Sequence, residues 1–155
     1  MHKIAVLDLR ILNIDRNVCN ILVKSGHPQC CDIDCCLIEQ DILTTESTSS
    51  KTRSCLKLIP IDHGLSIPDT LAVSSYELAW LSFDQAQEPF SRSTLEFISK
   101  IDVLKDIEQL ESCLPFRPVC LRNMRISNIL LKLGAANGLT LAQIGLILCR
   151  PDDDD

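Results

Sequence analysis

The chain has 155 residues, of which 46% are hydrophobic, and a formal net charge of −6 at pH 7. This length and composition can bury one hydrophobic core, which argues against a disordered or fibrous chain. Asp152 to Asp155 supply four of the 21 acidic residues, so residues 1–151 carry 15 basic and 17 acidic groups. A nearly neutral body with one Trp, one Tyr and four Phe offers no basic stripe or stacking platform. We therefore expect no nucleic-acid binding.

The sequence contains no apolar run near the roughly 18–20 residues that cross a bilayer. Its start, MHKIAVLDLR, has a polar break at Asp8, where the apolar region of a signal peptide would continue. The nine cysteines are odd in number, which favours reduced thiols over a disulfide scaffold. These features predict a cytoplasmic protein, with any membrane contact peripheral.

The first predicted elements are a helix and a hairpin. Residues 2–12 fit a buried helix or a strand, and we favour the helix. NILV at 20–23 and CLKLIPI at 55–61 have the pattern of two strands. The polar segment between them, residues 24–54, is rich in Ser, Thr and Cys and far longer than an ordinary connection. Its adjacent cysteine pairs lack the C-x-x-C spacing of structural zinc sites, so we expect exposed thiols in an inserted loop.

The chain beyond Pro68 has a helical pattern. Residues 76–83 predict a short apolar helix, whose Trp80 and Phe83 would face a lipid or a partner or, as is more common at helical spacing, lie in the core. Ser93 with Glu96 has the spacing of a capping box and predicts a helix start.

Three further helix boundaries are expected from the same kind of signal. The helical pattern after Ser93 is interrupted near Asp102, where we expect a restart. Residues 119–133 predict an amphipathic helix that stops at Gly134. Thr140 with Gln143 predicts the start of a final helix, which continues to Cys149.

Two acidic motifs carry the candidate chemistry. Phosphoryl transfer needs a carboxylate that orients the attacking hydroxyl and oxygen ligands that hold magnesium against the phosphates. The D-x-x-x-x-N spacing of Asp15 and Asn20 supplies both groups from one loop, and Asp62 follows a β-hairpin, as a second metal ligand does in kinases. A helix cap or an Asx turn is the plain alternative for each motif alone. The order of helix, D-x-x-x-x-N, hairpin, D-x-G and helical block favours the kinase interpretation.

The neighbours of these motifs have simpler expected roles. Gly64 would allow a sharp departure of the backbone after Asp62. His63 would pack or form a hydrogen bond beside the metal loop. Arg16 would either brace the catalytic loop or form an ordinary solvated or salt-bridged contact. Cys19 would be a small buried filler.

Several stretches closely resemble the phosphoinositide 3-/4-kinase superfamily, nearest to the plant gamma-type phosphatidylinositol 4-kinases. They are VLDLRILNIDRNVCNILV, LIPIDHGLSIP, FDQAQEPFS and the C-terminal LRNMRISNILLKLGAANGLTLAQIGLILCR. The resemblance implies that Asp15 is the catalytic aspartate and that Asn20 and Asp62 bind magnesium and the nucleotide ATP. It also implies a phosphatidylinositol substrate at a membrane surface and phosphatidylinositol 4-phosphate as the product. Related lipid kinases often have His or Gly at the position of Asn17.

The resemblance also implies a fold: an α+β, mainly helical C-terminal lobe of a protein-kinase-like fold, with a small β-hairpin at the catalytic cleft. Residues 1–150 would be a partial lipid-kinase catalytic domain with the inserted loop 24–54, and residues 151–155 an acidic tail. None of the five glycines lies in a glycine-rich phosphate loop before the catalytic motif. We therefore expect a catalytic lobe that is inactive without an N-terminal lobe. The alternative is a non-catalytic, kinase-derived helical interaction module.

Overall fold

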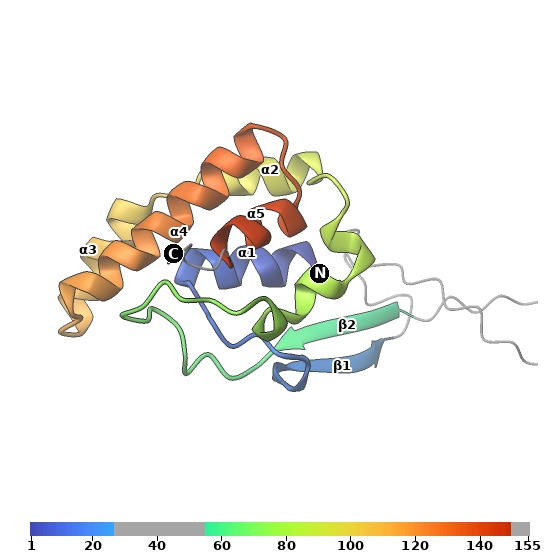
Figure 1. The fold of residues 1–155 in the computed structure, drawn as a ribbon, viewed down its shortest axis with the longest axis horizontal. Coiled ribbons are helices and arrows are strands. Elements are labelled where there is room, and N and C mark those ends of the chain that lie inside the picture. Colours follow the sequence, from blue (N-terminus) through green and yellow to red (C-terminus); the bar gives the residue numbers. More distant parts are fainter. Residues whose placement is uncertain (27–54, 150–155) are drawn as a thin grey trace, which may run out of the picture. The chain divides into compact units, whose positions relative to one another are not determined.

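A computed structural model describes residues 1–26 and 55–149 of the chain (Figure 1). Most of the predicted loop 24–54 and the predicted acidic tail 151–155 lie outside the described residues. The described part is α+β and mainly helical with a two-stranded antiparallel sheet, which confirms the coarse part of the expected fold class. It divides into two compact units, one made of Met1–Asn20 with Asp62–Asp155 and the other of Ile21–Ile61.

The smaller unit contains an antiparallel hairpin. Strand β1 (Ile21–Gly26) pairs with β2 (Cys55–Pro60) in a register that runs from Ile21 opposite Pro60 to Gly26 opposite Cys55. Both predicted strands are confirmed, but β1 extends three residues beyond its expected end, because residues 24–26 continue the pairing.

The larger unit is built around α1 (His2–Ile11) and α4 (Pro118–Ala136), which pack against each other (Figure 1). The predicted N-terminal helix is thus confirmed. It buries one face, formed by Ile4, Ala5, Val6, Asp8 and Leu9. The helix ends at Leu12, whose φ of 46° lies in the left-handed region. A leucine rarely adopts this conformation, and here it directs the chain into the Asp15 loop.

Three shorter helices surround α4, and their caps test the sequence signals. In α3 (Val103–Cys113) the Asp102 carboxylate accepts the Lys105 N–H, and in α5 (Leu141–Leu148) Thr140 and Gln143 form a complete capping box. Both predicted starts are confirmed. Helix α2 (Arg92–Ser99) is capped by Ser91, whose hydroxyl accepts the Thr94 N–H. The predicted start at Ser93 was therefore wrong, because an equally competent cap lies two residues earlier.

The predicted helix at 76–83 is replaced by short 3₁₀ turns. They are η3 (Ser75–Glu77), η4 (Ala79–Ser82) and η5 (Asp84–Ala86). The expected position of Trp80 is confirmed, since its side chain is fully buried, whereas Phe83 is only half-buried. Tight turns place these side chains inward without a continuous α-helix.

Helix α4 continues through Gly134, so the prediction that Gly134 ends it was wrong. A Cβ at Gly134 would lie 2.6 Å from Ile144 Cγ1, so the glycine permits the close approach of α5. Gly145 permits a close approach on another side of α5, because a Cβ there would lie 2.6 Å from Leu81 Cδ2 and 2.8 Å from Trp80 Cη2. Within residues 1–26 and 55–149, no helix is long and apolar enough to cross a membrane.

Candidate functional site: the Asp15 and Asp62 loops

The loop after α1 holds Asp15 in a fixed orientation. Asn17 Nδ2 donates to Asp15 Oδ1 at 2.6 Å, and Asn20 Nδ2 donates to Asp15 Oδ2 at 3.2 Å and to the Asp15 carbonyl at 2.9 Å. The Asp15 N–H in turn donates to Asn13 Oδ1 at 3.1 Å. The structure therefore brings the two ends of the D-x-x-x-x-N motif into direct contact.

The orientation of the Asn17 amide is itself fixed. Its Oδ1 accepts the Cys19 N–H at 2.9 Å, so its nitrogen is turned toward Asp15. The 3₁₀ turn η1 (Val18–Asn20) exposes the side chains of Val18 and Cys19. The prediction that Cys19 is a buried filler was therefore wrong, because the tight turn directs it outward.

The second loop contains Asp62, His63 and Gly64. Asp62 has a φ of 50°, and its Oδ1 accepts the Gly64 N–H at 3.1 Å. Asp62 thus adopts the left-handed backbone conformation, whereas the sequence had suggested that the sharp turn of the backbone occurs at Gly64. A Cβ at Gly64 would lie 3.2 Å from Asp62 Oδ1, so this glycine permits the close approach of the carboxylate.

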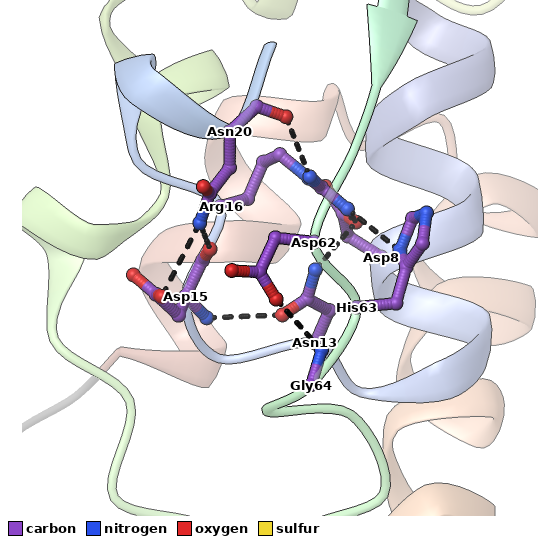
Figure 2. Close-up of polar contacts among 8 residues, drawn as sticks. All are labelled: Asp8, Asn13, Asp15, Arg16, Asn20, Asp62, His63 and Gly64. Carbon is purple, nitrogen blue, oxygen red and sulfur yellow. Dashed lines mark hydrogen bonds and ion pairs between the residues drawn. The ribbon is translucent and has the colours of Figure 1, made fainter.

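Backbone hydrogen bonds hold the two loops side by side. The Ile14 N–H donates to the Leu65 carbonyl at 3.2 Å, and the Ile67 N–H donates to the Ile11 carbonyl at 2.9 Å. The Asp62 carboxylate points toward Asp15 (Figure 2). The structure therefore gathers the three predicted site residues, Asp15, Asn20 and Asp62, around adjoining loops.

The Arg16 side chain extends from the first loop toward Asp8 and His63 and is completely buried (Figure 2). Its Nη1 donates to the Asn20 carbonyl at 2.8 Å, and its Nη2 lies 2.9 Å from His63 Nδ1. The contacts agree with the expected bracing of the loop and also with the salt-bridged alternative, since Arg16 pairs with Asp8, whereas the solvated alternative was wrong. Of the two roles expected for His63, packing or a hydrogen bond, the structure shows the hydrogen bond.

The charge of Arg16 is balanced by Asp8 of α1. Arg16 Nε lies 3.0 Å from each Asp8 carboxylate oxygen, Nη2 lies 2.9 Å from Oδ1, and Asn13 Nδ2 adds a weaker bond at 3.3 Å. Burial raises the pKa of Asp8, while hydrogen bonding and the positive charge of Arg16 oppose that rise. The pair is a forked, fully desolvated ion pair, which is costly to disrupt from one side only.

Helix α4 supports the point where α1 leads into the loop. Ser127 Oγ donates to the Leu9 carbonyl at 2.6 Å, and Asn128 Nδ2 donates to the Arg10 carbonyl at 2.6 Å. The last carbonyls of a helix lack partners within the helix, so these side chains satisfy them. Two buried polar residues of α4 therefore fix the end of α1 that precedes Asp15.

The donor groups fit a magnesium ion shared with phosphates. Asn20 turns its amide nitrogen toward Asp15, which leaves its oxygen on the opposite side, and Asp62 is exposed. Mg²⁺ prefers oxygen ligands and is commonly held by one or two carboxylates together with water and substrate phosphates. Among the described residues, no cluster of three His, Cys, Asp or Glu side chains could hold a metal without such help.

Asp8, Asn13, Ser127 and Asn128 were missed by the sequence interpretation. Asp8 carried a usable signal, because a charged residue on the buried face of a helix requires a partner. The other three carried no local signal, since Asn and Ser occur commonly on exposed helix faces and in turns.

Comparison with known proteins confirms the resemblance noted in the sequence. The family model described as phosphatidylinositol 3- and 4-kinase matches residues 1–144. Phosphatidylinositol 4-kinase gamma 3 of Arabidopsis thaliana is 40% identical over 151 residues, which cover 97% of this chain and 22% of that protein. Phosphatidylinositol 4-kinase gamma 8 of the same plant is 38% identical over 151 residues, which cover 97% of this chain and 25% of that protein.

A third relative, phosphatidylinositol 4-kinase gamma 4 of Oryza sativa subsp. japonica, is 40% identical over 152 residues, with 97% of this chain and 22% of that protein covered. The chain thus spans a quarter or less of the length of these curated relatives. The family match, in contrast, covers nearly the whole chain. The chain belongs to the phosphatidylinositol 3- and 4-kinase family.

Proposed function

We propose that this chain carries the catalytic and metal-binding loops of a phosphatidylinositol 4-kinase, which transfers the γ-phosphoryl group of ATP to the 4-hydroxyl of phosphatidylinositol. The observation that supports this most is the direct contact of Asn20 with Asp15 beside the Asp62 loop. Asp15 would accept the proton of the attacking hydroxyl. The curated relatives carry the name phosphatidylinositol 4-kinase gamma.

Asn20 and Asp62 would hold magnesium against the phosphates, and the metal would neutralise charge that develops on the transferred group. Asn17 and Asn20 both donate to the Asp15 carboxylate and restrict its rotation. A fixed carboxylate would help keep the attacking oxygen in line with the phosphorus, and such positioning is, with electrostatic stabilisation, one of the two contributions a protein makes to this reaction.

Activity would require the parts with which kinases hold ATP, a glycine-rich phosphate loop and a lysine-bearing strand, and the five glycines of this sequence form no such loop. The protein would be cytoplasmic and would bind its lipid substrate at a membrane surface, with which it would associate peripherally. We accordingly expect the 155-residue chain alone to be inactive as a lipid kinase.

A segment exchange tests this function. The matched 151 residues of the Arabidopsis gamma 3 relative would be replaced by this chain, and lipid phosphorylation would be measured with radiolabelled ATP. We expect the exchanged protein to make phosphatidylinositol 4-phosphate and its Asp15→Asn variant to lose at least about 100-fold in kcat. A folded but inactive exchange, beside an active parent protein, would instead support a non-catalytic helical interaction module.

A further inference from the structure

The guanidinium of Arg16 contacts both sides of the candidate site. It donates to the carbonyl of Asn20 and lies within hydrogen-bond distance of His63, the residue after Asp62. Asn20 and Asp62 are also the residues at which the chain leaves the larger unit for the hairpin and returns. One buried side chain thus touches the backbone of one candidate metal ligand and the neighbour of the other.

Three features make this contact rigid. Arg16 has no exposed surface, and its Nε and Nη2 form a fork with the Asp8 carboxylate. Its own carbonyl accepts the Ala79 N–H at 2.8 Å, which fixes the backbone from which the side chain extends. The side chain therefore has little freedom to follow either loop if the loops move apart.

We infer that Arg16 is a positioning residue that sets the separation of the two candidate metal ligands, with Asp8 holding its guanidinium and His63 relaying its position to Asp62. The metal role of Asn20 and Asp62 rests on the proposed function, whereas the mechanical link between the loops does not. Without the contacts of Arg16, Asn20 and Asp62 would still be present, but they would no longer be held at the separation that lets both bind one cation. Such supporting contacts commonly change metal affinity by about 10–100-fold.

The chain offers a matched control in Arg10, which pairs with Asp106 through Nε and Nη2 and contacts neither loop. Arg16→Lys keeps the positive charge near Asp8 but loses the fork that reaches Asn20 and His63. Arg10→Lys makes the same chemical change at the control pair.

Amide hydrogen exchange on the 155-residue chain tests the mechanical link. In Arg16→Lys we expect residues 62–66 to exchange about tenfold faster, while α4 stays protected and Arg10→Lys resembles the unmodified chain. His63→Gln, which retains a hydrogen-bond acceptor for Arg16, should restore slow exchange that His63→Leu loses. Equal exchange at residues 62–66 in Arg16→Lys and Arg10→Lys, or in His63→Gln and His63→Leu, would overturn the inference.

Mn²⁺ titration followed by NMR tests the metal role separately. We expect Mn²⁺ to broaden the amide signals of Asn20 and residues 62–64, and Arg16→Lys to require about tenfold more Mn²⁺ for the same broadening. Unchanged Mn²⁺ binding in a folded Arg16→Lys chain would overturn the positioning role. No broadening in the unmodified chain, together with the expected exchange results, would count against the proposed metal site and leave the link between the loops supported.

Discussion

Two arginines, Arg10 in the last turn of α1 and Arg16 in the loop that follows, form forked ion pairs with aspartates, and their surroundings differ. Arg10 pairs with Asp106 of α3 at 2.7 Å, and the two side chains keep 33% and 25% of their surface exposed. Arg16 pairs with Asp8 at 2.9 Å, with 0% and 1% exposed. The same chemical contact is therefore partly solvated in one case and fully desolvated in the other.

The difference in burial accompanies a difference in connections. The Arg10 pair joins two helices, whereas Arg16 also contacts Asn20 and His63 in the two candidate functional loops. Partly exposed pairs add little stability, because water and salt compete with the contact. A buried pair gains little overall but makes the loss of either partner costly, since the remaining charge stays desolvated.

The largest predicted effect comes from removing one carboxylate of each pair. Asp8→Asn should reduce the free energy of unfolding by about 3–5 kcal/mol, because it leaves the Arg16 charge buried without compensation. Asp106→Asn should reduce it by about 1 kcal/mol or less. Urea denaturation followed by circular dichroism measures both, and similar losses in the two variants would contradict the distinction.

A double replacement separates the charge from the contacts. In Asp8→Leu with Arg16→Met, both charges are removed and apolar groups fill the site, so we expect the chain to recover at least half of the stability lost in Asp8→Asn. If the double variant were as unstable as Asp8→Asn, the bonds from Arg16 to Asn20 and His63, rather than the ion pair, would account for most of the lost stability.

Asp15 is the third carboxylate in the comparison. It is half-buried, and the amides of Asn17 and Asn20 donate hydrogen bonds to it. Asp15→Asn should cost about 1 kcal/mol or less, because water can reach the side chain and replace a lost bond to Asn17 or Asn20. The thermal midpoint of the 155-residue chain measures this. A fall as large as that of Asp8→Asn would make Asp15 a structural residue and remove the basis for its catalytic role.

The sequence revealed the candidate site better than it revealed the support of that site. Asp15 and Asn20 could be predicted to act together because one loop carries both at a fixed spacing. Asp8 could be predicted to need a partner from its place on a buried helix face, but the identity of Arg16 as that partner depends on how the chain turns after Leu12. Ser127 and Asn128 bind carbonyls of a helix more than one hundred residues earlier, and no local pattern encodes such a contact.

Two predicted helix boundaries, the end of α4 and the start of α2, were wrong for a related reason. Gly134 resembled a helix stop, yet its missing side chain is needed where α4 meets Ile144. Ser91 and Ser93 were both able to cap α2, and the sequence alone did not distinguish them. The local sequence thus limited which residues could cap or end a helix, and packing between distant elements determined which of them did so.

Salt gives a smaller effect that sharpens the contrast between the two pairs. At 1 M NaCl the Debye length falls to about 3 Å, so the contribution of the partly exposed Arg10–Asp106 pair should largely disappear. The stability difference between the unmodified chain and Asp106→Asn should then shrink by up to about 0.5 kcal/mol, while that for Asp8→Asn should stay nearly constant. Denaturation at low and high salt measures both differences, and a marked loss of the Asp8 effect at high salt would mean that water reaches that pair.

Cys149 gives the smallest effect and shows what burial does to a titratable group without an opposite charge. Burial and the nearby negative charge of Glu77 raise the pKa of its thiol to about 11, whereas Asp8 has Arg16 to offset its burial. The thiolate is the reactive form, so at pH 8 only about one Cys149 in a thousand would be ionised. Alkylation with iodoacetamide, quantified by mass spectrometry of each cysteine peptide, should be slow at Cys149 and should accelerate about tenfold between pH 8 and pH 9. Exposed Cys19 provides the control, and rapid labelling of Cys149 at pH 8 would show that burial alone does not suppress ionisation in this chain.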